Sequence, residues 1–244
     1  MKPIVNGLWI GNPNLGSLEL LTLASFAKQG AEFHLWTYED LCTQVPDGVI
    51  VRDGNEILPA NTIFKYPERM LLDFGGGSYV GFSEIFRYKV LYDCGGWWSD
   101  MDVTCLKPLS LITEDYFFRT HGVLALVGNI MKVPRHSELM RLCYEKAKIE
   151  VNENTIDWHH AIRILGYYVE HLGLSKWIKN EFCNLDFMEC VNNFIRIPYE
   201  IDAIPENWFF IHWMNSVVNK QYCSGSVLER LLISHNCPLR RTFI

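Results

Sequence analysis

Apolar and polar residues follow the periods of strands and helices in turn along the chain. Residues 17–29 have helical periodicity, beginning at Ser17 as a capping residue and stopping at Gly30. Short apolar runs predict strands at 4–10, 32–37 and 48–52. This βαβ beginning predicts a parallel sheet with right-handed crossovers, whose ligand-binding loops lie at the carboxyl ends of the strands.

The same alternation continues to the end of the chain. A predicted helix at 84–94 stops at Gly95 and Gly96, and an apolar strand follows at 97–103. Further strands are predicted at 124–133 and 208–213, and further helices at 137–150 and 155–172. Because no repeat, low-complexity tract or linker interrupts this pattern, we expect one Rossmann-like, three-layer α/β/α domain over residues 1–244.

Composition and charge narrow the class of protein. The 244 residues are 49% apolar and 20% charged, enough for a single large core without metal or disulfide staples. The formal net charge of −6 argues against a general binder of nucleic acid or anionic membranes. No apolar run reaches the roughly 18–20 residues that cross a bilayer. Eight cysteines without a C-x-x-C pair predict reduced, buried thiols in a cytoplasmic protein, and no zinc site.

Two carboxylates carry the clearest chemical signal. Asp100 and Asp102 are two residues apart at the end of the predicted 97–103 strand, where extended geometry points both side chains to the same side. Such a pair suits Mg²⁺ or Mn²⁺ bridging to a phosphate. Taken alone, however, an Asp-x-Asp in a solvated turn needs no function. Arg87, on the preceding helix, either meets a charged substrate group or forms a surface ion pair.

The surrounding segment resembles the signature of a DXD-containing glycosyltransferase family. That family includes capsular-polysaccharide enzymes, initiating mannosyltransferases and lactosylceramide galactosyltransferase, and is distantly similar to the glucosyltransferase domain of clostridial toxins. The resemblance rests on Arg87-Tyr88, Tyr92-x-x-Gly95-Gly96, Trp97-Trp98, Asp100-x-Asp102 and Leu106-Lys107-Pro108. It implies a GT-A-type fold with a nucleotide-sugar-binding half over about 1–105 and an acceptor half over about 106–244.

The resemblance also implies roles for residues near both ends of the chain. Trp9, followed by Ile10 and Gly11, corresponds to a first-strand aromatic that packs on the nucleotide base, although a core tryptophan is the alternative. His212 and Asn215 correspond to a segment that closes over the diphosphate. Finally, Asn129 corresponds to a residue that faces the donor sugar, a strand-edge turn being the alternative.

The implied chemistry is metal-dependent sugar transfer with retention of configuration. The metal, Mn²⁺ or Mg²⁺, is expected on Asp100, Asp102 and His212, while Arg87 and Glu84 orient the sugar. Relatives often have Asp where this chain has Glu84. The implied donor is a nucleotide sugar, with UDP favoured and GDP the alternative. The implied acceptor is a glycan or a lipid-linked sugar in surface-polysaccharide or glycoprotein synthesis, with at most peripheral membrane contact.

Three other functions remain open at this stage. A metal-dependent phosphohydrolase or nucleotidyltransferase also uses paired aspartates. In phosphohydrolases, however, that pair directly follows the first strand, where this chain has Gly11, Asn12 and Pro13. A non-catalytic sugar-binding domain is a second alternative, although such a domain is expected to have lost some of the residues of the catalytic site. A toxin-like enzyme that glycosylates a protein is the third, for which the chain is short. The acceptor segment at 157–161 lacks the Gly-Pro typical of relatives.

Overall fold

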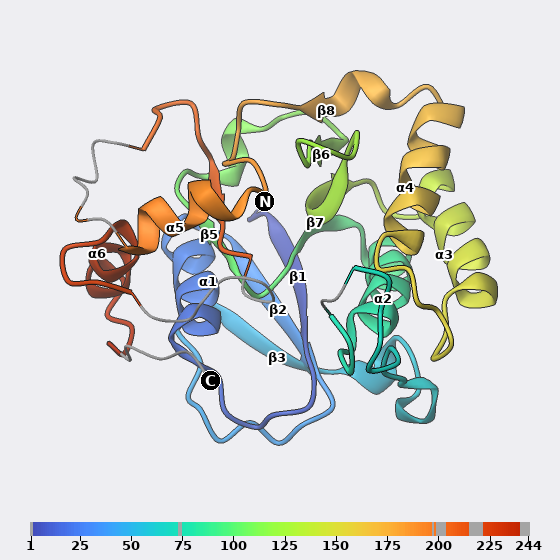
Figure 1. Cartoon of the computed structure of the whole chain (residues 1–244), viewed down its shortest axis with the longest axis horizontal. Coiled ribbons are helices and arrows are strands. Elements are labelled where there is room, and N and C mark those ends of the chain that lie inside the picture. Colours follow the sequence, from blue (N-terminus) through green and yellow to red (C-terminus); the bar gives the residue numbers. More distant parts are fainter. Residues whose placement is uncertain (1, 73–74, 197, 199–203, 215–221, 240–244) are drawn as a thin grey trace.

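A seven-stranded sheet forms the centre of the molecule, and a two-stranded sheet lies beside it (Figure 1). The computed structural model describes residues 2–72, 75–196, 198, 204–214 and 222–239. The large sheet has the order β3-β2-β1-β4-β7-β6-β8. Its strands are β1 (Ile4–Trp9), β2 (Glu32–Thr37), β3 (Val49–Asp53), β4 (Gly96–Ser99), β6 (Phe117–Arg119), β7 (Val127–Val133) and β8 (Ile178–Lys179). The small sheet pairs β5 (Val103–Cys105) with β9 (Phe210–His212).

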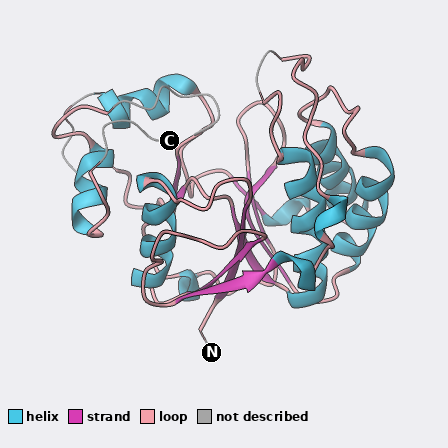
Figure 2. Ribbon diagram, turned by 90° about the horizontal axis from the view of Figure 1, so that it is seen from below, coloured by secondary structure: helices cyan, strands magenta, loops and turns pink. Residues whose placement is uncertain are grey.

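Helices cover both faces of the large sheet, as Figures 1 and 2 show. One face packs against α1 (Ser17–Lys28), α5 (Met188–Arg196) and α6 (Val227–Ser234). The other packs against α2 (Val80–Cys94), α3 (Glu138–Glu150) and α4 (His160–His171). Short 3₁₀ turns occur at Gly54–Glu56, Ala60–Thr62, Leu109–Leu111 and Ser175–Trp177. Two buried apolar clusters, one on each face, confirm the predicted layered α/β architecture.

The strand order reverses between β1 and β4. The chain first adds β2 and β3 on one side of β1, each pair parallel, and then returns to place β4 on the other side. β4 is also parallel to β1, with Val5 opposite Trp97 and Asn6 opposite Trp98. The carboxyl ends of β1 and β4 therefore form the crevice in which open α/β sheets bind ligands. β7 and β6 continue the sheet in antiparallel pairings.

The predicted strand at 97–103 is two strands in two different sheets. β4 ends at Ser99, residues 101–102 form a turn, and β5 begins at Val103. The prediction of one extended strand through Asp100 and Asp102 is therefore wrong, although both side chains face the same cavity. The physical reason is that the chain changes partners within the motif. The backbone N–H of Asp100 donates to Asn129 on β7, whereas the carbonyl of Asp102 accepts from Trp213 beyond β9.

Several element boundaries differ from the predictions. α2 begins at Val80, a turn before the predicted start, and α4 begins at His160. Gly16, rather than Ser17, is the N-cap of α1. The strands β6 and β8 and the helices α5 and α6 were not predicted, because each is too short to show several periods of its pattern. β9 covers only the centre of the predicted 208–213 strand.

The cysteines are unpaired wherever their side chains are described. Cys105, Cys143, Cys183 and Cys237 are buried, as predicted. Cys42 and Cys94 are exposed, so the expectation of buried thiols is wrong for these two. Among the described residues, no helix has both the length and the apolar character needed to cross a membrane.

Gly95 offers a test of the turn that leads into β4. It ends α2 with a φ of +68°, and an added Cβ would lie 2.5 Å from the backbone nitrogen of Arg135. Gly30 follows Gln29, the C-cap of α1, with a similar φ of +81°, but nothing lies within 4 Å of an added Cβ. We predict that Gly30→Ala costs about 1 kcal/mol and that Gly95→Ala costs about 1–3 kcal/mol more, because only the second adds a backbone collision. Urea unfolding of both variants measures the difference, and equal losses would contradict it.

Candidate active site

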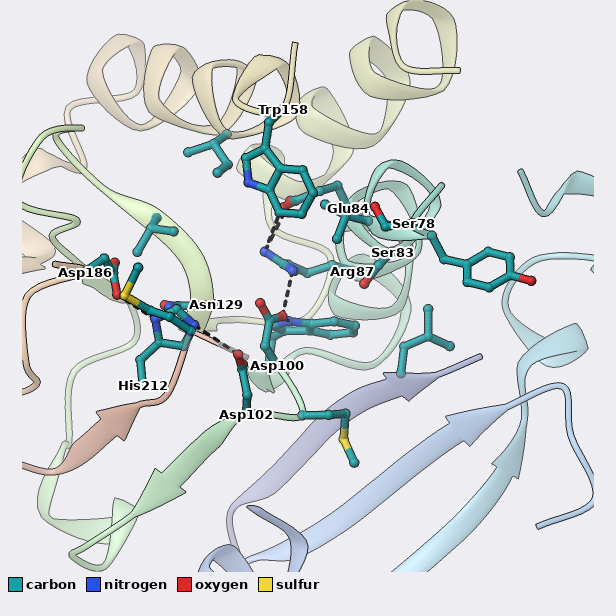
Figure 3. A pocket seen from close by; sticks show the side chains of 18 of the residues that line it. Ser78, Ser83, Glu84, Arg87, Asp100, Asp102, Asn129, Trp158, Asp186 and His212 are labelled. Carbon is teal, nitrogen blue, oxygen red and sulfur yellow. Dashed lines mark hydrogen bonds and ion pairs between the residues drawn. The ribbon is translucent and has the colours of Figure 1, made fainter. Parts of the chain in front are cut away.

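A cavity of about 730 Å³ opens at the carboxyl ends of β1 and β4. It gathers most of the residues that the sequence singled out: Trp9, Ile10, Glu84, Arg87, Asp100, Asp102, Asn129 and His212. Gly11 does not line the cavity but lies against the ring of Tyr79, which does. Asn215 lies outside the described residues. Figure 3 shows how side chains from α2, the β4–β5 turn, β7 and β9 face one another.

Arg87 is a buried cation between two carboxylates. It lies three residues after Glu84 on α2, so both side chains lie on one helix face. Its Nη1 donates to Glu84 Oε1 at 3.2 Å, and its Nη2 donates to Asp100 Oδ1 at 2.7 Å. The guanidinium also lies over the ring of Trp98, whose Nε1 donates to the same Asp100 oxygen at 2.7 Å. With only 3% of its surface exposed, Arg87 is not the surface ion pair of the alternative interpretation.

Burial and charge act against each other in this group. Burial raises the pKa of Glu84 above its usual range, and the positive charge of Arg87 opposes that rise. Burial likewise raises the pKa of Asp100, again against the effect of Arg87. The guanidinium is therefore the charge that keeps two neighbouring carboxylates in a desolvated site. Asp100 is anchored through Oδ1, which fixes the start of the turn.

Asp102 faces His212 across the cavity. Oδ2 of Asp102 lies 3.5 Å from Nε2 of His212, and the other ring nitrogen, Nδ1, lies 2.5 Å from Oδ1 of Asp186 (Figure 3). Asp102 precedes β5 and His212 ends β9. The antiparallel pairing of these strands places Val103 opposite His212, and this register brings the two side chains together. Asp186 also lines the cavity.

Arg119 connects Asp186 to Asn129 from outside the cavity. It is 2% exposed and does not line the cavity. Its Nη1 donates to Asp186 Oδ2 at 2.8 Å and to Asn129 Oδ1 at 3.2 Å, and its Nη2 donates to Asp186 Oδ1 at 2.8 Å. Because a guanidinium has no acceptor, the Asn129 amide must turn its oxygen toward Arg119. Asn129 lies within β7, which excludes the strand-edge turn considered above.

The carboxylates determine the charge of His212. Burial alone lowers the pKa of His212, but Asp102 and Asp186 outweigh it and raise that pKa to about 10. Burial raises the pKa of Asp186, but His212 and Arg119 outweigh it and hold that pKa well below its usual range. Without a metal, the ring is therefore an imidazolium between two carboxylates at neutral pH.

The Asp102–His212 pair fits a divalent cation. Oxygen and nitrogen ligands bind Mn²⁺ or Mg²⁺ at about 2.1 Å, so two ligands at one ion lie about 3 Å or more apart. The observed 3.5 Å between Asp102 Oδ2 and His212 Nε2 is compatible with a cation between them. Within the described ranges, no three His, Cys, Asp or Glu side chains are arranged as a complete metal site. A metal held here would thus keep positions for water or phosphate oxygens.

Sequence analysis did not identify three polar residues of this region. Asp186, with Asn184, interrupts the apolar run at 182–188, and that alternation was an available signal. Arg119 follows three aromatic residues and had no motif. His121 lines the cavity with Nε2 3.8 Å from Asp186 Oδ2. Burial lowers the pKa of His121, which keeps it neutral near pH 7.

Comparison with protein families identifies the central segment. Residues 75–118 match the glycosyltransferase sugar-binding region containing a DXD motif. The matched residues include Glu84, Arg87, Asp100 and Asp102, so the match confirms the resemblance on the segment that carries it. No curated protein matches the chain.

Several solved glycosyltransferases have a distantly similar structure. PaToxG glycosyltransferase is 13% identical, with 72% of this chain and 77% of that chain covered and a TM-score of 0.42. LgtC, a galactosyltransferase solved with donor and acceptor sugar analogues, is 8% identical, with 96% and 95% covered and a TM-score of 0.44. GlyE of Streptococcus pneumoniae is 12% identical, with 96% and 60% covered and a TM-score of 0.46.

The charge of His212 predicts how stability depends on pH without metal. Its pKa in the folded protein, about 10, is above the unfolded value of 6.5, so its contribution is complete below pH 6.5 and is lost as pH rises toward 10. In EDTA, the wild type should lose its stability advantage over His212→Gln across this interval. Urea unfolding of both proteins at several pH values measures it. A difference that stays constant or grows with pH would contradict this assignment.

Proposed function

We propose that this protein is a metal-dependent glycosyltransferase of the GT-A type that takes its sugar from a nucleotide diphosphate donor. The observation that carries the proposal is the pair formed by Asp102 and His212. It lies at the reversal of strand order, beside the Asp100–Arg87 ion pair and within the matched DXD region. This arrangement combines a cation site with a buried guanidinium in one cavity.

In this proposal Asp102 and His212 hold Mn²⁺ or Mg²⁺, and Asp100 supports the same ion from the start of the turn. When bound, the metal supplies positive charge to the diphosphate as negative charge builds on the leaving group. The chain prepares that site by fixing both ends of the turn. Asp100 is bonded to Arg87 and Trp98, and the carbonyl of Asp102 is bonded to Trp213.

The donor lies between the end of β1 and α2. Trp9 and Ile10 line the β1 side of the cavity and receive the base, with UDP favoured by the resemblance and GDP the alternative. Arg87 and Glu84 orient the sugar from α2. Asn129 contributes a directed donor, because its oxygen faces Arg119 and its buried Nδ2 has no hydrogen-bond partner among the described residues. A sugar or phosphate oxygen would satisfy that amide.

We propose transfer with retention. The bond between the anomeric carbon and the phosphate oxygen breaks, and the acceptor oxygen bonds to the same face of that carbon. The acceptor proton passes to the departing diphosphate. The hydrogen bonds of the carboxylates support this route over a covalent intermediate, since Glu84, Asp100 and Asp186 each accept from an arginine. None of these three is positioned as an independent covalent nucleophile.

The acceptor enters past an apolar rim. Val123 and Leu72 both line the cavity and are 75% and 43% exposed. Trp158 and His159 line the cavity beside them, at the start of α4. This rim supports an acceptor whose sugar is attached to an apolar group, such as a lipid-linked sugar, over a free polar glycan. Surface-polysaccharide or glycoprotein glycan synthesis is the proposed role, and the unpaired thiols favour a cytoplasmic setting.

The reaction can be tested with a panel of UDP- and GDP-sugars, with Mn²⁺ or with EDTA. We predict Mn²⁺-dependent release of one nucleoside diphosphate, reduced at least about 100-fold in Asp102→Asn because a charged metal ligand is lost. Asp93→Asn is the matched control and should keep wild-type activity, since the Asp93 carboxylate pairs with Lys89 on α2 and does not line the cavity.

The identity of the released nucleotide separates the alternatives. Release of a nucleoside monophosphate would indicate a phosphohydrolase or nucleotidyltransferase and would contradict the proposal. Equal rates of donor turnover with Mn²⁺ and with EDTA would contradict the metal dependence. Binding of a donor without any release, with or without an acceptor, would favour a non-catalytic sugar-binding domain.

The acceptor rim can be tested with methyl and dodecyl glycosides of the accepted sugar. Val123→Ser should raise KM for the dodecyl glycoside about fivefold, because roughly 1 kcal/mol of apolar contact is lost. The methyl glycoside and donor hydrolysis should be unaffected. Ile149→Ser is the control, since Ile149 is similarly exposed, at 73%, on α3 and does not line the cavity. Equal KM values for both glycosides in the wild type would exclude an apolar subsite.

A further inference from the structure

His212 is held by one short segment at both its backbone and its ring. Asn184 makes two hydrogen bonds to the backbone of His212: its Oδ1 accepts from the N–H at 2.8 Å, and its Nδ2 donates to the carbonyl at 3.0 Å. Two residues later, Asp186 contacts the imidazole through Oδ1 at 2.5 Å. The segment runs beside β9, where Cys183 bridges to Phe210. Asn184 therefore fixes the position of the His212 backbone, and Asp186 fixes the orientation of its ring.

The contact to Asp186 decides which ring nitrogen faces the cavity. Because a carboxylate only accepts, Nδ1 must carry a proton and donate to Asp186. In a neutral ring, Nε2 then has its lone pair free for a metal. That nitrogen is the one that lies 3.5 Å from Asp102 Oδ2. The other neutral tautomer, with its proton on Nε2, would present an N–H to the same place and bind no cation.

Arg119 holds Asp186 in place. Both Oδ atoms of Asp186 accept from Arg119 at 2.8 Å, in a two-pronged contact that fixes the plane of the carboxylate. Arg119 also donates to the carbonyl of Asn184, so the same guanidinium holds both residues of this segment that contact His212. Arg119, Asn184 and Asp186 are all nearly fully buried, at 2%, 1% and 8% exposure. This rigidity exceeds what a surface ion pair provides.

We propose that Asp186, held by Arg119, is a positioning residue that sets the tautomer and orientation of His212 for binding a divalent cation. The inference rests on the proposed metal site. Carboxylates that accept from a metal-bound histidine typically change metal affinity about 10–100-fold when they are removed. A purely structural ion pair would affect folding without any specific effect on the metal.

The test measures binding of Mn²⁺ alone, followed by the electron paramagnetic resonance signal of the free ion. Wild type, Asp186→Asn, His212→Gln and the double variant form a cycle. Asp102→Asn tests whether the bound Mn²⁺ lies at the proposed site. Glu114→Gln is the matched control, because Glu114 forms a carboxylate–cation pair with Lys179 at 3.2 Å and does not line the cavity. Thermal unfolding of each protein checks that it is folded.

We expect Asp186→Asn to weaken Mn²⁺ binding about 10–100-fold in the wild-type background and less than about twofold when His212 is already Gln. Glu114→Gln should bind as the wild type does. Unchanged affinity in Asp186→Asn, or an equal loss in both backgrounds, would overturn the inference while leaving the metal site intact. If the wild type does not bind Mn²⁺, or if Asp102→Asn binds it as the wild type does, the proposed function and the inference are overturned together.

A second variant covers the case in which Asp186→Asn does not fold, since Arg119 would then lose its charged partner. Replacing the pair together, as Arg119→Met with Asp186→Leu, removes both buried charges and keeps their approximate volume. This protein should fold and show the same 10–100-fold loss of Mn²⁺ affinity. Wild-type affinity for Mn²⁺ in the folded Arg119→Met, Asp186→Leu protein would overturn the inference.

Discussion

Compensation of negative charge is the constraint on which the site depends. Glu84, Asp100, Asp102 and Asp186 all line one cavity, and carboxylates in a desolvated space need cations nearby. Arg87 satisfies one pair and Arg119 satisfies Asp186. Asp102 pairs with His212. A divalent cation would replace the proton of that imidazolium and supply more positive charge than it removes. A divalent cation between Asp102 and His212 would therefore add to the compensation that the two arginines provide.

The fold brings these charges together by reversing its strand order. β1 and β4 are parallel neighbours, so their carboxyl ends open on the same side of the sheet. The chain then leaves the sheet within the Asp-x-Asp segment and pairs β5 with β9. That pairing brings His212, from near the end of the chain, opposite Val103 and next to Asp102. The turn is thus a structural joint between two sheets as well as a site for ligands.

Sequence signals predicted the layered architecture and most of the charge network. The first βαβ unit has clear periodicity and helix stops, and its elements were found nearly at their true boundaries. Glu84, Arg87, Asp100 and Asp102 lie within one continuous motif. By contrast, Arg119 and Asp186 are 67 residues apart and meet only through tertiary structure. The break between β4 and β5 was also missed, because an apolar run does not reveal a change of strand partner.

Binding of UDP with Mn²⁺ and with EDTA, measured by titration calorimetry, tests the central claim that this cavity is a metal-assisted diphosphate site. The account predicts saturable binding of one UDP per chain with Mn²⁺ and a loss of at least about tenfold in affinity with EDTA, since the carboxylates alone repel a diphosphate. If GDP is the donor nucleotide, it will show the same dependence in place of UDP. Equal affinity for both nucleotides with and without the metal, or no binding of either, would contradict it.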